Sequence, residues 1–322
     1  MKVKLSEITR LKPAPRIIEV GESDGPSSHG WHAVSAFIRC PKEFQFRHVR
    51  KIVSPTSETP DNLAVGILLH AAKAEWFARG FAADEVTLDH IRQVIIATGE
   101  KQPLPVRDQA EQKALRYFEE YVKHWRIRPK PKSVACELLL GPAPLVKGDN
   151  PILWRTGRLD DVSYYPEAGG HLAIGDLKTT SASIQDTLNE YALHGQPLLY
   201  SILWRMAPQG EAVYGPIRGV VLDIVQKGYG DKPSKFARAF VPTPEFAQQW
   251  FARDLRTALA DVALVTPTSE AWRNVTACTR MLGRGRRKCD YHSICTHGRS
   301  SGLSYLTTDG KRLTSLDYDW WK

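Results

Sequence analysis

The chain contains, at residues 154–180, the sequence WRTGRLDDVSYYPEAGGHLAIGDLKTT. Two runs of alternating or apolar residues flank a Pro-Glu-Ala-Gly-Gly turn, a pattern that predicts two strands joined as a hairpin. Asp160 lies near the end of the first strand, and Asp176 and Lys178 lie two apart on the second. Because residues i and i+2 of a strand point to one face, Asp176 and Lys178 should project together, with Asp160 close to them.

Two converging carboxylates beside a lysine suit Mg²⁺ or Mn²⁺, which prefer oxygen ligands and activate a bound water for attack on a phosphodiester. The lysine could hold or deprotonate that water, or stabilise the transition state. A surface hairpin with an ordinary salt bridge is the alternative, and it is the commoner meaning of an isolated Asp-x-Lys tripeptide. The surrounding sequence therefore has to separate these two interpretations.

Outward from this hairpin, the hydrophobic pattern changes period. The first 130 residues favour amphipathic or apolar helices: 36–51 with Ser35 as N-cap, 62–80, 84–99 and 107–126. After the RPKPK breaker, the pattern predicts strands at 133–140, 152–165, 171–180, 217–228 and 235–241, and helices at 196–206 and 243–264. We therefore expect an α/β fold, with a mixed central sheet flanked by helices.

Composition narrows the class of protein. The 322 residues include 44 Lys and Arg against 35 Asp and Glu, a net charge of +9, which suits a polyanion such as DNA. There is no run of 18 apolar residues and no apolar leader, so we expect neither membrane insertion nor secretion, but a cytoplasmic protein. Five cysteines, an odd number, argue against a disulfide framework and for metal ligation or buried thiols.

Two further pairs of residues accompany the acids. Gly66 and His70 lie one turn apart in a predicted apolar helix, where the glycine would let another backbone approach. His70 could be a metal ligand, a phosphate contact or a satisfied core histidine. Gln196 and Tyr200 share a helical face and could anchor the site or a DNA strand, or simply pack half-buried.

In chain order, Gly66-x-x-x-His70, an apolar strand with Glu137, Gly157-Arg-Leu-Asp160, Asp176-Leu-Lys178-Thr and Gln196-x-x-x-Tyr200 resemble the motifs of the RecB-like branch of the PD-(D/E)XK nucleases. The resemblance covers about residues 30 to 300. It implies a restriction-endonuclease-like core in which His70, Asp160, Asp176 and the carbonyl of Leu177 bind the catalytic metal. It further implies that Lys178 is catalytic, with Gln196 and Tyr200 supporting the site.

The remaining cysteines extend the resemblance. Cys278, Cys289 and Cys295 lie in a compact basic segment that also contains Arg284, Arg286, Arg287 and Lys288, and zinc would also accept such thiolates. Cys40, in SAFIRCPKEF, resembles the N-terminal cysteine of the iron–sulfur members of this branch, the AddB and CRISPR-associated exonuclease type. By that resemblance Cys40, Cys278, Cys289 and Cys295 hold a structural [4Fe–4S] cluster. Cys136 is left as a buried thiol.

The sequence thus predicts four regions: a leading segment at 1–30, a helical region at 31–131, a nuclease core at 132–265 and an iron–sulfur segment at 266–322. The predicted function is a Mg²⁺- or Mn²⁺-dependent DNA exonuclease acting on single strands or duplex ends in phage or bacterial recombination or repair. Two alternatives stay open, a CRISPR spacer-processing nuclease with its integrase partners and a non-catalytic iron–sulfur scaffold that binds DNA.

Overall fold

The computed structural model describes residues 30–53, 61–100, 104–144, 154–192, 194–228, 232–266, 269–274, 279–282, 285–289, 291, 295 and 306–307. These residues form two compact units. The first contains residues 61–141 and 157–249, and the second contains residues 30–53, 142–144, 154–156 and the described residues from 250 onward.

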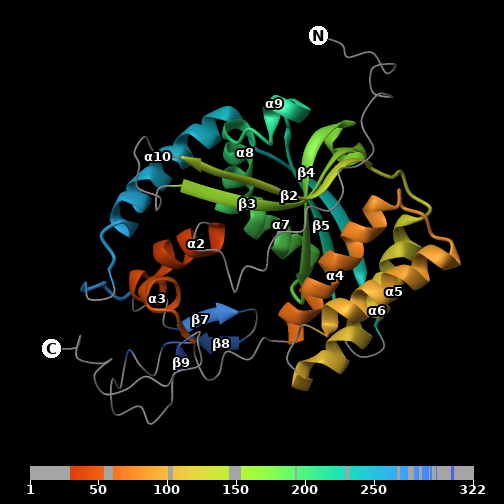
Figure 1. The fold of residues 1–322 in the computed structure, drawn as a ribbon, viewed down its shortest axis with the longest axis horizontal. Coiled ribbons are helices and arrows are strands. Elements are labelled where there is room, and N and C mark those ends of the chain that lie inside the picture. The colour runs from red at the N-terminus through yellow and green to blue at the C-terminus, as the bar shows by residue number, and fades with distance from the viewer. Residues whose placement is uncertain are drawn as a thin grey trace. The chain divides into compact units, whose positions relative to one another are not determined.

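The first unit is built on a five-stranded sheet (Figure 1). Its strands are β2 (Lys132–Pro144), β3 (Trp154–Tyr165), β4 (His171–Thr180), β5 (Gly219–Gln226) and β6 (Lys235–Pro242). They lie in the order β2-β3-β4-β5-β6, with β3 antiparallel to β4, β4 parallel to β5, and β5 antiparallel to β6. The observed fold is therefore the expected α/β fold with a mixed sheet.

The β3–β4 hairpin forms as its sequence predicts. The turn is a short 3₁₀ helix, η3 (Pro166–Ala168), followed by Gly169 and Gly170, which both have positive φ. Glycine adopts this backbone without strain. The register runs from Tyr165 opposite His171 to Asp161 opposite Gly175, so Asp160 lies one residue beyond the last of these pairs.

Helices α4 (Asp61–Ala78), α5 (Glu85–Gly99) and α6 (Leu104–Trp125) pack together beside the sheet, in orange and yellow in Figure 1. Helix α4 is apolar on most of its circumference, as a helix buried on several sides must be. Trp76 of α4 packs edge-on against Phe81, Phe118 and Tyr121, and Leu177 of β4 joins the same core. The next helices are α7 (Ile184–Ala192), α8 (Gly195–Met206), α9 (Glu211–Tyr214) and α10 (Glu245–Val262).

The second unit brings together segments from both ends of the described chain. It contains α2 (Trp31–Arg39), α3 (Pro41–Phe44), the π-helix η1 (Gln45–Val49), β1 (Ile52–Val53), β7 (Thr279–Leu282), β8 (Gly285–Lys288) and β9 (Leu306–Thr307). Strand β1 pairs with β9, and β7 pairs with β8, both antiparallel.

The helix predicted to begin at Ser35 differs from the observed one. Helix α2 already begins at Trp31 and ends at Arg39, because Cys40 takes an extended backbone (φ −160°, ψ 105°) ahead of Pro41. A residue that precedes proline is sterically disfavoured in the helical region. Cys40 therefore lies between two helices, α2 and α3, rather than on the face of one.

Candidate active site

The first acid of the site is anchored to the neighbouring strand and to helix α4. Asp160 Oδ2 accepts a hydrogen bond from the Leu177 amide at 2.6 Å, in place of a ladder bond between β3 and β4. The same oxygen lies 3.1 Å from Nδ1 of His70, which projects from α4. Asp160 thus joins two of the residues that the sequence analysis grouped with it.

The second acid and the lysine project from β4 on the face opposite Leu177. Lys178 Nζ lies 2.9 Å from Asp176 Oδ2 and donates to Gln196 Oε1 at 3.3 Å. Gln196 in turn donates to the Tyr200 hydroxyl at 2.8 Å, one helical turn further along α8. Asp176, Lys178, Gln196 and Tyr200 therefore form one connected chain of polar contacts.

The electrostatics of the two acids differ. Burial would raise the pKa of Asp160, but His70, Lys73 and Lys178 outweigh that effect and hold the pKa well below its usual range. For Asp176, burial together with the negative charge of Asp160 outweighs the pairing with Lys178 and raises the pKa. Two buried carboxylates near one lysine and one histidine therefore leave Asp176 short of compensating positive charge.

Lys178 stays charged in this site. Burial opposes its charge, but the Asp176 carboxylate outweighs burial and raises the pKa of Lys178 above its usual value. Its ammonium also lies 5.1 Å from the ring centroid of Tyr191, which projects from α7. Tyr191 is a site residue that the sequence analysis missed, although Ile184, Leu188 and Tyr191 have the i, i+4, i+7 spacing of a helix face.

Glu137 on β2 belongs to the same electrostatic environment. Its backbone has φ +49°, a conformation that non-glycine residues rarely adopt and that tends to occur at functional sites. Burial and the charge of Asp160 raise the pKa of Glu137 to about 7. Arg158, on the strand that carries Asp160, has Nη1 3.9 Å from Glu137 Oε2.

The two adjacent acids of GRLDD lie in different surroundings. The Asp160 side chain is 16% exposed, whereas that of Asp161 is 1% exposed and lies 3.1 Å from Lys73 Nζ. Tyr165 and Ser163 both donate hydrogen bonds to Asp161 Oδ1, at 2.6 and 2.8 Å. Asp160 is therefore the acid of this pair that reaches the site.

Gly66 does allow a close approach to helix α4, but of a side chain. A Cβ at this position would lie 3.4 Å from Thr179 Oγ1 of β4, an ordinary van der Waals distance, and no backbone atom is nearer. The close approach of a backbone that the sequence analysis expected here was wrong.

The acids form ion pairs rather than a finished metal cage. Within the described residues, no group of three or more His, Cys, Asp or Glu side chains is arranged closely enough to hold a metal ion. Asp160 pairs with His70, and Asp176 pairs with Lys178. Asp176 Oδ2 is buried and lies 2.9 Å from the Lys178 ammonium, and since a carboxylate oxygen can accept more than one such contact, it could also bind a cation.

Three of the predicted cluster cysteines lie in the described part of the second unit. Cys40 is buried, and Cys289 and Cys295 are half-buried against a small core of Phe46, Ile52 and Tyr291. The Tyr291 hydroxyl donates to the Ile52 carbonyl at 2.8 Å, which ties the two ends of the chain together. Cys278 lies outside the described residues. Cys136, on β2, is half-buried, and burial raises the pKa of its thiol to about 12.

The basic segment between Cys278 and Cys289 forms the β7–β8 hairpin. Arg286 and Arg287 pair with Met281 and Arg280 in that hairpin. Arg284 lies outside the described residues, as do the side chains of the arginines and Lys288 on β8. The predicted DNA contact of these side chains therefore stays a prediction.

Among the helices that the structure describes, none is both long and apolar enough to cross a bilayer. The chain matches no curated protein. The family model of the PD-(D/E)XK nuclease superfamily matches residues 31–296, a range that contains every residue of the site just described. With a mixed sheet that presents Asp160, Asp176 and Lys178 together, the chain belongs to the PD-(D/E)XK nuclease superfamily.

Proposed function

We propose that this protein is a Mg²⁺- or Mn²⁺-dependent DNA exonuclease. The observation that carries the proposal is the connected set Asp160, Asp176 and Lys178, held by the Leu177 amide and by Gln196. Members of the superfamily usually use Mg²⁺ or Mn²⁺. The net charge of +9 is in keeping with DNA as the substrate.

The residues present fit a hard divalent cation. Asp160, Asp176 and the carbonyl of Leu177 would supply the oxygen ligands that such cations prefer, and His70 would add one imidazole nitrogen. Burial, with the nearby charge of Asp160, raises the pKa of Asp176, so a bound cation would stabilise the charged form of this carboxylate. The bound cation would activate a water and withdraw charge from the phosphate.

The chain's own residues position the reacting groups. The Leu177 amide fixes Asp160, so that this carboxylate does not have to reorganise during the reaction. Lys178, charged and held by Gln196 Oε1 and the face of Tyr191, would orient the attacking water or stabilise the charge that develops on the phosphate. Tyr200 orients the Gln196 amide through its hydroxyl, so that the amide oxygen faces Lys178.

A scaffold that only binds DNA would not require this arrangement. A lysine with 18% side-chain exposure beside a carboxylate with 4% exposure is costly to bury, and a DNA-binding surface gains nothing from burying it. The contacts of Lys178 with Asp176 and Gln196 are those expected of a residue that acts on a bound substrate. This favours the nuclease over the non-catalytic alternative.

The nuclease activity is tested with end-labelled single-stranded and duplex DNA in Mg²⁺, in Mn²⁺ and in EDTA. We expect metal-dependent release of short products from the ends, while covalently closed circular DNA stays intact. Cleavage of the circle would show an endonuclease, and the absence of cleavage of every substrate would refute the proposal. Copurification with an integrase would place the enzyme in CRISPR spacer processing rather than in cytoplasmic recombination or repair.

We also propose that Cys40, Cys278, Cys289 and Cys295 hold a structural [4Fe–4S] cluster. In support, Cys40, Cys289 and Cys295 belong to one compact unit. Segments far apart in the sequence already meet in this unit, because Gln45 Nε2 donates hydrogen bonds to the carbonyls of Thr266 and Ser269, each 2.7 Å long.

Protein purified without oxygen should be brown and contain about four irons per chain if the cluster is present. Cys40→Ser should remove the colour and lower the melting temperature, because ligand binding of this kind contributes to folding. Cys136→Ser is the matched control and should stay brown. One stoichiometric zinc in colourless anaerobic protein would replace the cluster with a zinc site, and metal-free protein would refute both.

A further inference from the structure

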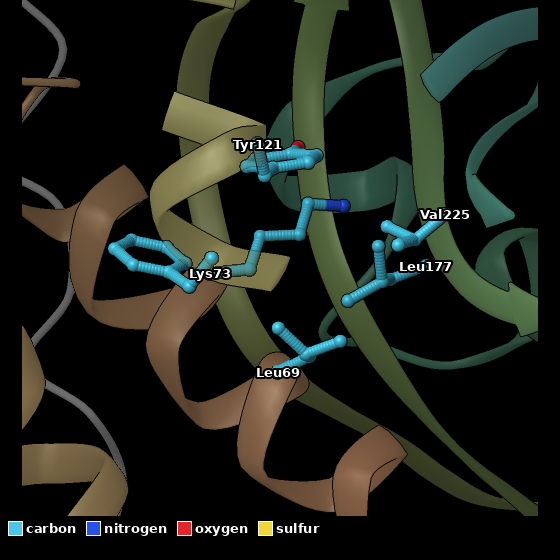
Figure 2. Close-up of a pocket in the computed structure, with 6 residues that line it drawn as sticks. Leu69, Lys73, Tyr121, Leu177 and Val225 are labelled. Atoms are coloured by element: carbon cyan, nitrogen blue, oxygen red, sulfur yellow. The ribbon is translucent and has the colours of Figure 1, made fainter. Parts of the chain in front are cut away.

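A buried cluster of charged residues lies behind the candidate active site. Lys73 Nζ of helix α4 lies 3.1 Å from Asp161 Oδ2 on β3 and 3.5 Å from Asp223 Oδ2 on β5. The exposed fractions of these three side chains are 3%, 1% and 0%. In Figure 2 the Lys73 side chain extends from the helix past Tyr121, beside Leu177 and Val225 of the sheet.

The cluster is closed to solvent and balanced in charge. Arg238 Nε lies 3.0 Å from Asp223 Oδ2, so two cations, Lys73 and Arg238, face the two anions Asp161 and Asp223. The Tyr121 hydroxyl donates to Asp223 and accepts from Arg238 Nη2 at 2.8 Å. The space beside Lys73 amounts to about 10 Å³ for the centre of a water-sized sphere, so at most one water molecule fits there.

Lys73 is held as a cation in this place. Burial opposes the charge, but Asp161 and Asp223 outweigh burial and raise the pKa of Lys73 above its usual value. A buried cluster of ion pairs is costly to desolvate, and replacing all of its charged residues with well-packed apolar residues is often neutral or stabilising, although removing one partner alone is strongly destabilising. Its presence therefore calls for an explanation other than stability.

The members of the cluster adjoin the residues of the active site along the chain. Lys73 lies three residues after His70 on α4, and Asp161 directly follows Asp160 on β3. Asp223 is the register partner of Leu177 in the β4–β5 pair. Lys73 thus links the helix that carries His70 to the two strands that flank Asp176.

We propose that Lys73 is a positioning residue, which fixes His70 and Asp160 relative to each other by binding Asp161 and Asp223. By engaging Asp161, Lys73 also leaves Asp160 as the acid of this pair that is free to bind the cation. The inference rests on the proposed metal-dependent function. Residues that orient metal ligands in this way typically contribute 10- to 100-fold to metal affinity or activity.

The test uses the double variant Lys73→Met/Asp161→Asn in the full-length protein. It removes one positive and one negative charge, so the cluster stays neutral with Arg238 and Asp223, while the link between α4 and β3 is lost. We expect a folded protein that binds Mn²⁺ at least tenfold more weakly, measured from the free Mn²⁺ signal in electron paramagnetic resonance. Asp161→Asn alone, which keeps the Lys73–Asp223 contact, should weaken Mn²⁺ binding at least threefold and serves if the double variant does not fold.

The matched control is Glu75→Gln on the same helix. Glu75 Oε1 lies 2.6 Å from Arg79 Nε, and this ion pair involves no residue of the buried cluster. Breaking it should therefore leave the Mn²⁺ affinity unchanged. Folded variants that bind Mn²⁺ as the wild type does would overturn the inference alone. A wild type that binds Mn²⁺ but cuts no DNA would overturn the proposed function alone, and a wild type that binds no Mn²⁺ would overturn both.

Discussion

Gly175→Ala tests how tightly the strand before Asp176 is packed. A Cβ at this position would lie 2.1 Å from Asp161 Oδ2 and 2.2 Å from Tyr165 Oη, whereas Cβ contacts in proteins are almost never shorter than 3.0 Å. Both side chains are buried and bonded to each other at 2.6 Å, so neither can turn toward solvent. The methyl group must therefore displace the Asp161 carboxylate or the strand.

The expected cost has two parts. Overpacking a filled core costs about 1–3 kcal/mol. Loss of the hydrogen bond from Tyr165 to a buried carboxylate adds about 1.5–3 kcal/mol. We therefore expect Gly175→Ala to lower the free energy of unfolding by about 3–5 kcal/mol, which for a protein of this size lowers the melting temperature by about 4–7 °C.

Thermal and urea unfolding, followed by circular dichroism, measure this effect. Gly66→Ala is the control, because its Cβ meets only Thr179 Oγ1 at 3.4 Å and alanine is favoured over glycine in a helix by about 1 kcal/mol. In a Tyr165→Phe background one of the two clashing atoms is gone, so Gly175→Ala should cost less there. If Gly175→Ala costs under about 1 kcal/mol, or no more than Gly66→Ala, the packing argument is refuted.

Three further predictions concern the site itself. Asp176→Asn should lose Mn²⁺ binding and cleavage, whereas Lys178→Met should bind Mn²⁺ but cleave about 10³-fold more slowly or worse. The double variant should cleave no more slowly than the more damaged single variant, because the effects of residues that act as a unit are not additive. Calorimetry measures Mn²⁺ binding, and single-turnover kinetics measure cleavage. Between about pH 4.5 and pH 7 the folded metal-free protein holds a proton on Glu137 that the unfolded chain releases, so the free energy of unfolding should fall as pH rises through this window. Denaturant titrations at several pH values measure this dependence, which Glu137→Gln should make weaker. Tyr191→Leu should lower kcat roughly threefold to tenfold, which corresponds to the loss of a cation–π contact worth about 1 kcal/mol. Tyr191→Phe keeps the aromatic ring and should have a kcat near that of the wild type. Equal losses of kcat in the two variants would argue against the contact.

The strands of the core could be predicted from local sequence. Strand β4 occupies residues 171–180 as predicted, and the described part of β3, Trp154–Tyr165, lies within the strand predicted at 152–165. Alternating or apolar runs between glycine and proline turns contain enough local information to place such strands. Helix α7 was not predicted, because its residues are mostly polar and it is only nine residues long, so its apolar periodicity is weak. With it, the contact of Tyr191 with Lys178 was missed.

The second unit was predicted less well. Pro41 ends the regular helix at Arg39, although the apolar spacing of Phe37, Cys40 and Phe44 continues through it, so the periodicity alone gave one helix where there are two. The β7–β8 hairpin lies in a segment so rich in arginine that hydrophobic alternation gave no signal of a strand. Local pattern is a poor guide where charge hides the period or proline interrupts it.

The sequence by itself determined the α/β class, the hairpin with Asp160, Asp176 and Lys178, and the order of the motifs, because each depends on spacings of a few residues. Only the tertiary structure decided which of two adjacent acids reaches the site. Neighbouring residues of a strand point to opposite faces, and Asp161 is bound by Lys73, 88 positions earlier in the chain. The raised pKa of Glu137 is likewise a tertiary property, since burial and the charge of Asp160, 23 positions later, produce it. Desolvation and charge pairing act through space, and a linear pattern of residue types does not contain those distances.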